Sequence, residues 1–571
     1  MAPDTTEPAS PVPSRLPGAS RLGIGIAQGI ALLALSRLVD GEASNGWVVA
    51  NPKGFGLLVL LATLLPLPVL LGLGHMRARV LAAWTLAAAG LILLLGGHDL
   101  RQHGEATMTP ASNGLVASLG GMLFVGQVLV AAADAGRRWW PRYADCFESA
   151  WRAGLQLALS GCFVLGFWLI YWVGSELFQA IGIDALDRLG GRLGFVLPVT
   201  TVLGAIGIHL ADAGWRLTLG LRNILLGLKA WLTPVLAGLA AAFLLSLPFT
   251  GLEVLGQRDD AAGWLIAAAA GLVALVSAVH GDGRGRPPAP LRHAARLASF
   301  ILPVLVVLAG WLLTRQIGGQ GLTEGRVVGV AALSVLAVHA VAYPVAAARP
   351  GMRLLERANI VAALLALPVL AALNLPVADP ARLEARSQTG RLLRGAVAPD
   401  DFDFGHLTGL GRDGNRALAA LKGHPDPEIA RRAALAGAPS SDAARESAGE
   451  EGAAPRLRAV PDGTALPPGL PEAMREALPE CLAEVCLARA FPPLGEGIWL
   501  VGPVYGRFWV MRPEGAGWRR AAIYDAPYHC QGQFRDGLLE GDARAVPPPF
   551  PDLDLSGMRF RTVLLQEEVC R

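Results

Sequence analysis

Charged residues are scarce in this chain of 571 residues: Asp, Glu, Lys and Arg make up 17% of it, whereas 53% of the residues are hydrophobic. Soluble globular domains contain about 25% charged residues, so the composition excludes an ordinary assembly of soluble domains. No basic helix or stripe with interleaved aromatic residues occurs, which argues against nucleic acid as a partner. We therefore expect a multi-pass membrane protein whose main partner is the lipid bilayer.

The motifs of the common enzyme classes are also missing. The sequence has no G-x-x-x-x-G-K-[ST] phosphate loop, no H-E-x-x-H and no G-x-S-x-G in a strand-turn-helix setting. Asp400, Asp401 and Asp403 lie close to His406; they could bind a divalent ion or act in acid–base catalysis, but capping of a helix is the favoured interpretation. We name no catalytic residue and predict no cofactor and no metal site.

Long uncharged runs, by contrast, are frequent, and eleven of them are long enough to cross a hydrocarbon core of about 30 Å as helices. A helix satisfies its own backbone hydrogen bonds in lipid. No small-residue cleavage site follows the first run, so we interpret it as an anchor rather than a signal peptide. The expected spans are Leu22–Val39, Gly54–Gly74, Ala78–Gly96, Ala111–Ala133, Ala153–Gly174, Leu193–Leu210, Lys229–Phe249, Ala262–Val279, Ala294–Thr314, Val327–Ala348 and Ala358–Leu375.

The distribution of basic residues between alternate connections predicts the orientation. One set of connections carries 18 Lys and Arg residues and the other set carries 7, and the richer set is expected in the cytoplasm. With an odd number of spans, the amino terminus is then cytoplasmic and the C-terminal domain extracytoplasmic. The richer set consists of Arg15, Arg21, Arg77, Arg79, Arg137, Arg138, Arg142, Arg152, Arg216, Arg222, Lys229, Arg284, Arg286, Arg292, Arg296, Arg349, Arg353 and Arg357.

Within the spans, small residues are dense and ionisable residues are rare. The run GIGIAQG at Gly23–Gly29 is typical of helices that approach closely in lipid. His209 and Asp212 have the i, i+3 spacing of one helical face, which fits a proton relay or, preferably, an interfacial pair. Glu176 precedes an apolar stretch that predicts a short amphipathic helix on the outer surface, where the carboxylate could line a cavity or lie at the interface.

The composition changes after Leu375. We expect a disordered tail at residues 1–20, a transmembrane helix bundle at 21–376, a helical juxtamembrane segment at 377–438, a flexible linker at 439–457 and a small α+β domain at 458–571. Helices are predicted at Ala381–Arg394, Asn415–Leu421, Pro427–Leu435 and Glu472–Leu487. The apolar and aromatic runs IWLVGPV, RFWVMR, WRRAAIY and RFRTVLL predict a small antiparallel sheet. The fold class is thus mainly α.

Four of the six cysteines, Cys481, Cys486, Cys530 and Cys570, lie in the domain predicted outside. They allow three pairings, and we expect at least one disulfide there. On a continuous helix Cys481 and Cys486 would point about 140° apart, so a bond between them requires the helix to end between them. A zinc site that adds His529 to these cysteines is the competing interpretation, although its spacing is not a standard one.

Two stretches resemble a known family. ARSQTGRLLRGAVAPDDFDFGHLTGLGRDGNRALAAL, from Ala385 to Leu421, and WRAGLQLALSGCFVLGFWLIYWVGSELFQAIGI, from Trp151 to Ile183, are similar to bacterial membrane proteins of the domain-of-unknown-function family numbered 4153. The resemblance implies a multi-pass protein of the bacterial envelope and brings no reaction with it; we predict that the protein lies in the inner membrane. The matching positions, which would fix the fold of the juxtamembrane segment, are Gln388, Arg391, Phe402, Asp403, Gly411 and Gly414.

Three functional classes follow from the sequence. An envelope assembly, scaffolding or signalling protein with a partner-binding outer domain is favoured by that domain and by a membrane region poor in charge. A secondary transporter would need a site near the membrane midplane. A membrane enzyme acting on a lipid-linked substrate would need acidic residues at an outer groove.

Overall fold

The computed structural model describes residues 16–39, 46–103, 111–256, 258, 260–285, 287–349, 351–399, 401–436, 457–461, 464–477, 481, 486–503, 508–515, 517–524, 553–555 and 558–560. The chain forms two compact units, Met1–Ile429 and Ala430–Arg571. The first unit contains the apolar helices and most of the juxtamembrane segment. The second contains the β-strands.

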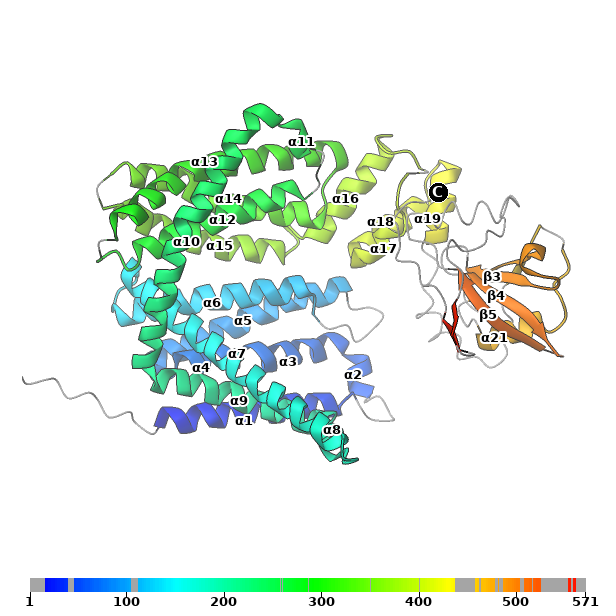
Figure 1. Ribbon diagram of the computed structural model, residues 1–571, viewed down its shortest axis with the longest axis horizontal. Coiled ribbons are helices and arrows are strands. Elements are labelled where there is room, and N and C mark those ends of the chain that lie inside the picture. Colours follow the sequence, from blue (N-terminus) through cyan, green and yellow to red (C-terminus); the bar gives the residue numbers. More distant parts are fainter. Residues whose placement is uncertain are drawn as a thin grey trace, which may run out of the picture. The chain divides into compact units, whose positions relative to one another are not determined.

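The first unit is built from α-helices, most of them long and aligned with one another (Figure 1). In chain order, the first nine helices among the described residues are α1 (Leu16–Arg37), α2 (Gly46–Ala50), α3 (Pro52–Leu64), α4 (Pro66–Gly72), α5 (Ala78–His103), α6 (Asn113–Ala135), α7 (Tyr143–Gln179), α8 (Ala185–Gly190) and α9 (Leu193–Ala213). They are followed by α10 (Trp215–Thr250), α11 (Glu253–Gly256), α12 (Ala261–His280), α13 (Ala289–Gln320), α14 (Glu324–Ala347) and α15 (Arg353–Leu373).

Within the described residues, eleven helical segments are long and apolar enough to cross a membrane, one at each position expected from the sequence. Helices α3 and α4 together make one of them, Pro52–Gly72, because Pro66 has no backbone N–H to donate and begins a new helix. The prediction of a polytopic helix bundle followed by a small α+β region is confirmed. The protein is an integral membrane protein.

The loop expected after the fifth span differs from the prediction. Helix α7 continues without a break to Gln179, so Glu176, Leu177 and Phe178 belong to the spanning helix itself. Only the short helix α8 follows, at Ala185–Gly190. The expected amphipathic helix starting near Glu176 is therefore wrong, because the helical hydrogen-bond ladder of α7 extends beyond the length that spans the bilayer.

Helices α1 and α9 pack with almost no side chain between them. A Cβ atom built on Gly25 would lie 2.8 Å from Cβ of Ala205, and one on Gly29 would lie 2.6 Å from Cα of Pro198. Both glycines are buried, whereas the intervening Ile26 is 44% exposed. The small-residue pattern of the first span thus produces a close helix contact, as expected of helices that pack in lipid.

The largest buried apolar cluster joins α10 and α12–α15 and includes Leu272, Leu302, Leu305 and Leu312. A second cluster joins α3, α5 and α6 to the end of α15. Large apolar side chains are exposed along one side of α10, among them Ile224, Leu228, Leu232, Val235 and Leu239. The spacing of these exposed residues along the helix is that of a face turned toward lipid.

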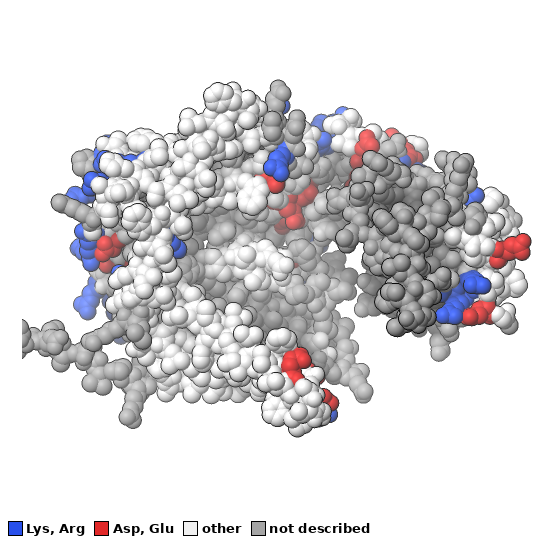
Figure 2. Space-filling model, in the orientation of Figure 1, with Lys and Arg blue, Asp and Glu red and all other residues white. Residues whose placement is uncertain are grey.

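Charged side chains avoid the middle of the bundle. In Figure 2 the central part of the visible bundle surface is white, and blue side chains gather at the left end of the bundle. Contacts identify this end: Arg21 at the start of α1 pairs with Asp212 at the end of α9, and His280 at the end of α12 pairs with Glu356 at the start of α15. We call it the arginine-rich end.

The juxtamembrane segment contains the three helices expected there. Helix α16 spans Pro380–Leu393, α18 spans Gly411–Lys422 and α19 spans Pro427–Ala436, with the short α17 at His406–Gly409 before α18. Asp379 caps α16, since its Oδ1 accepts a hydrogen bond from the Arg382 amide at 3.2 Å. The expected linker at 439–457 falls outside the described residues except for residue 457, and the expected tail does so up to residue 15.

The second unit contains a five-stranded sheet in the order β1-β2-β3-β4-β5 and a two-stranded one of β6 and β7. The strands are β1 (Leu457–Val460), β2 (Cys486–Ala490), β3 (Trp499–Pro503), β4 (Phe508–Glu514), β5 (Gly517–Tyr524), β6 (Leu553–Leu555) and β7 (Met558–Phe560), with helix α21 at Leu470–Ala477 and a 3-10 turn, η1, at Pro492–Leu494.

Two expectations for this unit need correction. Strand β1 pairs with β2 in parallel, so the sheet is mixed rather than wholly antiparallel. The helix predicted over Glu472–Leu487 is wrong at its end, because Cys486 and Leu487 begin β2. A parallel pair needs a crossover connection, and α21 lies within it. Pairing with β1 and β3 therefore overrides the helical periodicity of the local sequence.

Candidate functional site

Asp212 is at the centre of a polar cluster at the arginine-rich end. Its Oδ2 accepts a hydrogen bond of 2.9 Å from Nη1 of Arg21, and its Oδ1 lies 2.6 Å from Nε2 of His75. Arg21, only 1% exposed, also donates to the carbonyl oxygens of Leu70 and Leu73 at 3.2 and 2.7 Å. The cluster therefore joins α1 to α9 and to the end of α4.

Helix α7 contributes to the same cluster. Nε2 of Gln156 donates to Oδ1 of Asp212 at 3.3 Å, and Nη1 of Arg152 lies 2.7 Å from Nδ1 of His75. With its partners in place, the carboxylate of Asp212 has the hydrogen bonds that a partly buried charge requires. The cluster therefore joins the ends of α1, α4 and α9 to residues within α7.

His209 and Asp212, which were expected to pair, do not contact each other through a hydrogen bond in the described structure. The imidazole of His209 lies against α1, where a Cβ on Gly18 would approach its Cε1 and Nε2 to 2.9 Å. Its Nδ1 is buried without a hydrogen-bond partner in the described part of the chain. Glu176 is exposed and lies in the last turn of α7. The three sequence candidates thus occupy separate environments.

A second polar cluster at this end was missed by the sequence analysis. The hydroxyl of Tyr343 donates to Oδ1 of Asn359 at 2.7 Å and lies 3.0 Å from Oγ of Ser277. Nδ2 of Asn359 donates to Ser277 at 3.2 Å and to the Tyr143 hydroxyl at 3.5 Å. These residues come from α7, α12, α14 and α15. Isolated polar residues in apolar runs were the available signal, but which of them meet depends on the packing.

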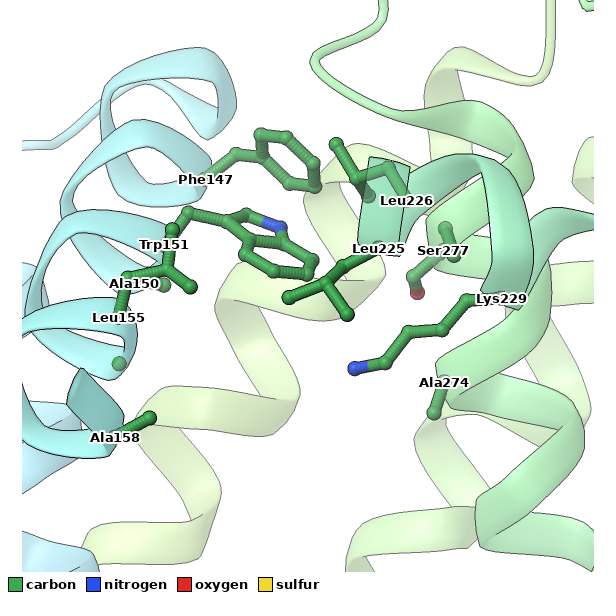
Figure 3. Close-up of a pocket in the computed structure, with 12 residues that line it drawn as sticks. Phe147, Ala150, Trp151, Leu155, Ala158, Leu225, Leu226, Lys229, Ala274 and Ser277 are labelled. Atoms are coloured by element: carbon green, nitrogen blue, oxygen red, sulfur yellow. The ribbon is translucent and has the colours of Figure 1, made fainter. Parts of the chain in front are cut away.

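An open pocket of about 440 Å³ lies beside this cluster, between α7, α10 and α12 (Figure 3). Lys229 extends from α10 toward Trp151 of α7, with its Nζ 5.1 Å from the ring centroid. Ser277 of α12 contributes a hydroxyl to the wall. The rest of the lining is apolar or small: Phe147, Ala150, Gly154, Leu155, Ala158, Leu225, Leu226, Ala274 and Ala278.

Another pocket, of about 670 Å³, lies between α12, α13 and α14 at the opposite end of these helices. Asp260, Gln316 and Arg326 are among its polar lining residues. Arg326 donates to the Gly321 carbonyl at 2.7 Å and to the side chain of Gln320, so local groups already use its donors. We find the pocket beside Lys229 better suited to a charged ligand.

Two of the positions named for the family resemblance contact the turn between α13 and α14. Gln388 donates to the carbonyls of Gln320 and Leu322 at 3.1 and 3.0 Å, in the turn between α13 and α14. The Arg391 side chain packs at the same turn, where a Cβ on Gly321 would lie 2.7 Å from its Cδ.

The remaining four positions lie around α17. Phe402 stacks edge-on with Phe404 at 4.8 Å between ring centroids, and Oδ1 of Asp403 accepts from the His406 amide at 2.9 Å. Gly411 has a positive φ of 64°, and a Cβ on Gly414 would lie 1.9 Å from the Leu407 carbonyl oxygen. Both glycines are required by the backbone.

The acidic cluster before α17 fits a capping role more closely than a catalytic one. Asp403 binds the first amide of that helix, and His406 Nε2 lies 2.8 Å from Oε1 of Glu384. Asp401 is exposed, and Asp400 falls outside the described residues. In the described part of the chain no group of three or more His, Cys, Asp or Glu could hold a metal ion.

In the second unit, Cys481 and Cys486 form a disulfide with an S–S distance of 2.07 Å. The bond becomes possible because Cys486 lies in a strand rather than on a continuous helix. These two sulfurs are therefore not available as zinc ligands. Cys530, Cys570 and His529 lie outside the described residues.

Comparison with known proteins gives no relative from which a role could be transferred: no family model, no curated protein and no solved structure matches the chain.

Proposed function

We propose that this integral membrane protein is an assembly, scaffolding or signalling protein of the bacterial envelope. Its bundle lies in the inner membrane, and its C-terminal domain binds partners outside the cytoplasm. Membership of the domain-of-unknown-function family numbered 4153 is part of this proposal. The observation that carries it is the polar docking of the juxtamembrane segment onto the ends of the bundle helices.

The docking at the α13–α14 turn uses one face of α16. Oγ of Ser387 accepts from the Leu322 amide at 2.9 Å, and Oε2 of Glu384 accepts from the Glu324 amide at 2.6 Å. Glu384 is 4% exposed. A buried carboxylate is costly unless hydrogen bonds compensate it, so these contacts hold α16 in one position against the bundle.

A second contact holds the same segment at the end of α5. Asp379 Oδ2 lies 2.9 Å from Nε2 of His98 and accepts from Nε2 of Gln102 at 3.0 Å. Gln102 also donates to Asp413 of α18 at 2.7 Å. The end of α5 and the α13–α14 turn thus both bind the juxtamembrane segment by hydrogen bonds. A shift of α5 relative to α13 would therefore move this segment. Such coupling suits a protein that links its membrane region to an outer domain.

A secondary transporter remains a second candidate because six of the spanning segments in the described residues contain an internal proline, which can kink or interrupt a membrane helix. The internal prolines are Pro66, Pro68, Pro198, Pro234, Pro248, Pro303, Pro344 and Pro368. The charged clusters described above lie at helix ends rather than near the middle of the spans, which favours the assembly or signalling role.

Complementation of a deletion strain tests the proposal. We expect the full chain to restore envelope composition, measured by lipid and cell-wall analysis, and a membrane-inserted variant ending at Ala436 to fail. Glu384→Ala, which removes the docking carboxylate, should fail partly, whereas Arg386→Ala, which changes an exposed residue of the same helix, should complement fully. Full complementation by the shortened variant would contradict the role of the outer domain. Loss of small-molecule uptake as the sole defect would favour the transporter.

The orientation needs its own measurement. A reporter active only outside the cytoplasm, fused after Arg571, should be active, and the same reporter fused before the first span should be silent. The opposite result would place the C-terminal domain in the cytoplasm and remove the basis for an outer partner.

A further inference from the structure

We propose that the pocket between α7, α10 and α12 binds one anionic phospholipid from the leaflet at the arginine-rich end. Its phosphate would lie at Lys229, and its acyl chain would extend along the small residues of α7. The proposal concerns the bundle alone and does not depend on which partner the C-terminal domain binds.

One end of the pocket lies near the charged end of the bundle, and the pocket extends away from that end. Ser277 lies within one turn of His280, the last residue of α12, and His280 pairs with Glu356 at the arginine-rich end. Along α7 the lining continues from Phe147 to Ala158, which is about 16 Å of helix at 1.5 Å per residue. A ligand of this length with one polar end matches the dimension and polarity of a lipid.

The ammonium of Lys229 extends into the pocket and has no carboxylate partner among the described residues. In the described residues, no ion pair of Lys229 is present, and the group that its ammonium meets is the Trp151 ring. The nearest acidic residue of α7 in sequence, Glu148, already pairs with Arg222 of α10. A cation–π contact is worth about 0.5–1 kcal/mol at an exposed site, which leaves the ammonium well suited to pair with a phosphate.

Arg222 lies on the same face of α10 as Lys229. Arg222, Leu225, Leu226 and Lys229 follow the i, i+3, i+4, i+7 spacing of one helical face, and the last three line the pocket. The Nε atom of Arg222 is buried and has no hydrogen-bond partner among the described residues. The guanidinium of Arg222 pairs with Glu148 and does not line the pocket, so Arg222 contributes positive charge near the site rather than a contact to the phosphate.

The deeper part of the pocket is open. A Cβ built on Gly154 meets no atom within 4 Å, and Ala158 and Ala274 are also too small to fill the space. In Figure 1, α10 runs at a steep angle to the other long helices of the first unit. Helices that cross steeply touch over a short length and diverge beyond it, which explains why space remains next to α7.

The alternative is a lysine that reaches the headgroup region without selecting a lipid, as Lys side chains near helix ends commonly do. The two explanations differ in their response to filling the pocket. Gly154→Leu keeps the charge of Lys229 but occupies the space of the acyl chain, and a Cβ atom at Gly154 would meet no atom within 4 Å. Gly161→Leu is the matched control, since Gly161 lies on the same helix, also has no atom within 4 Å of an added Cβ, and does not line the pocket.

The test uses the purified full chain in detergent and a fluorescent phosphatidylglycerol. We expect phosphatidylglycerol to compete better than phosphatidylcholine with the same acyl chains. Lys229→Gln should weaken the binding of phosphatidylglycerol about fivefold, the equivalent of about 1 kcal/mol per basic residue, and Lys229→Arg should restore most of it. Gly154→Leu should remove binding, and Gly161→Leu should leave it unchanged.

Three results would overturn the proposal. The first is equal competition by the two lipids, and the second is an equal loss of lipid binding with Gly154→Leu and with Gly161→Leu. The third is displacement of the fluorescent lipid by inorganic phosphate at the concentration at which unlabelled phosphatidylglycerol displaces it. The last result would identify a site for a free anion rather than for a lipid.

Discussion

The close contact of α1 with α9 predicts a sharp difference between two identical substitutions in one helix. Gly29 faces α9, where an added Cβ would lie 2.6 Å from Cα of Pro198 and 2.7 Å from Oγ1 of Thr201. Gly23, six residues earlier, is exposed and has no atom within 4 Å of such a Cβ. Gly29→Ala should therefore destabilise the bundle, and Gly23→Ala should not.

The magnitude follows from the contact distance. Carbon atoms pack best at about 3.5–4.0 Å, so the new methyl group of Gly29→Ala would have to move α1 and α9 apart by about 1 Å. Overpacking of this kind costs about 1–3 kcal/mol. The gain in helix propensity from Gly to Ala is about 1 kcal/mol, and it cancels when the two variants are compared with each other.

Reversible unfolding in detergent micelles with an increasing fraction of dodecyl sulfate, monitored by tryptophan fluorescence and circular dichroism, measures the two free energies of unfolding. We expect Gly29→Ala to be less stable than Gly23→Ala by about 1–3 kcal/mol. A difference below about 0.5 kcal/mol, which is the usual range for surface changes, would show that α1 does not rest on α9 at this distance.

Two further predictions concern charge and covalent bonding. Asp212→Asn should destabilise the bundle by about 3 kcal/mol in the same unfolding assay, because it leaves the buried Arg21 without its carboxylate partner. The double variant Arg21→Met, Asp212→Leu should recover part of that loss. Equal stability of Asp212→Asn and the unsubstituted chain would contradict the prediction. Peptide mass spectrometry without reduction should find Cys481 bonded to Cys486. Reduction of this bond should lower the stability of the second unit by about 2 kcal/mol, which is the entropic effect of closing so short a loop. Recovery of both cysteines as free thiols from protein purified without reductant would refute the bond.

Much of the bundle was predictable because lipid imposes one local rule. A run of about twenty apolar residues must form a helix to satisfy its backbone, so the eleven spans could be located from composition alone. The same reasoning gave the wrong end for the fifth spanning helix, which was predicted to stop at Gly174. The rule sets the minimum length of a spanning helix but not its maximum length. Helix α7 continues to Gln179 because nothing at Glu176 interrupts its hydrogen-bond ladder.

The candidate site was less accessible to sequence reasoning. Spacing along one helix suggested that His209 and Asp212 meet, but the partners of Asp212 are Arg21 and His75, which are 191 and 137 residues away in sequence. Lys229 was predicted to begin a span beside a basic connection, but it lies inside the continuous helix α10, Trp215–Thr250. Its position over Trp151 depends on how α10 crosses α7, and no local pattern encodes that crossing.

By itself, then, the sequence determined which segments are helices in lipid and where the basic residues concentrate, because both depend on neighbouring residues and on the solvent around them. The tertiary structure alone decided which polar groups meet, that β1 and β2 are parallel, and that a pocket opens beside Lys229. Those outcomes depend on contacts between segments far apart in the chain. Such contacts are selected by the packing of all helices and strands together, not by any one of them.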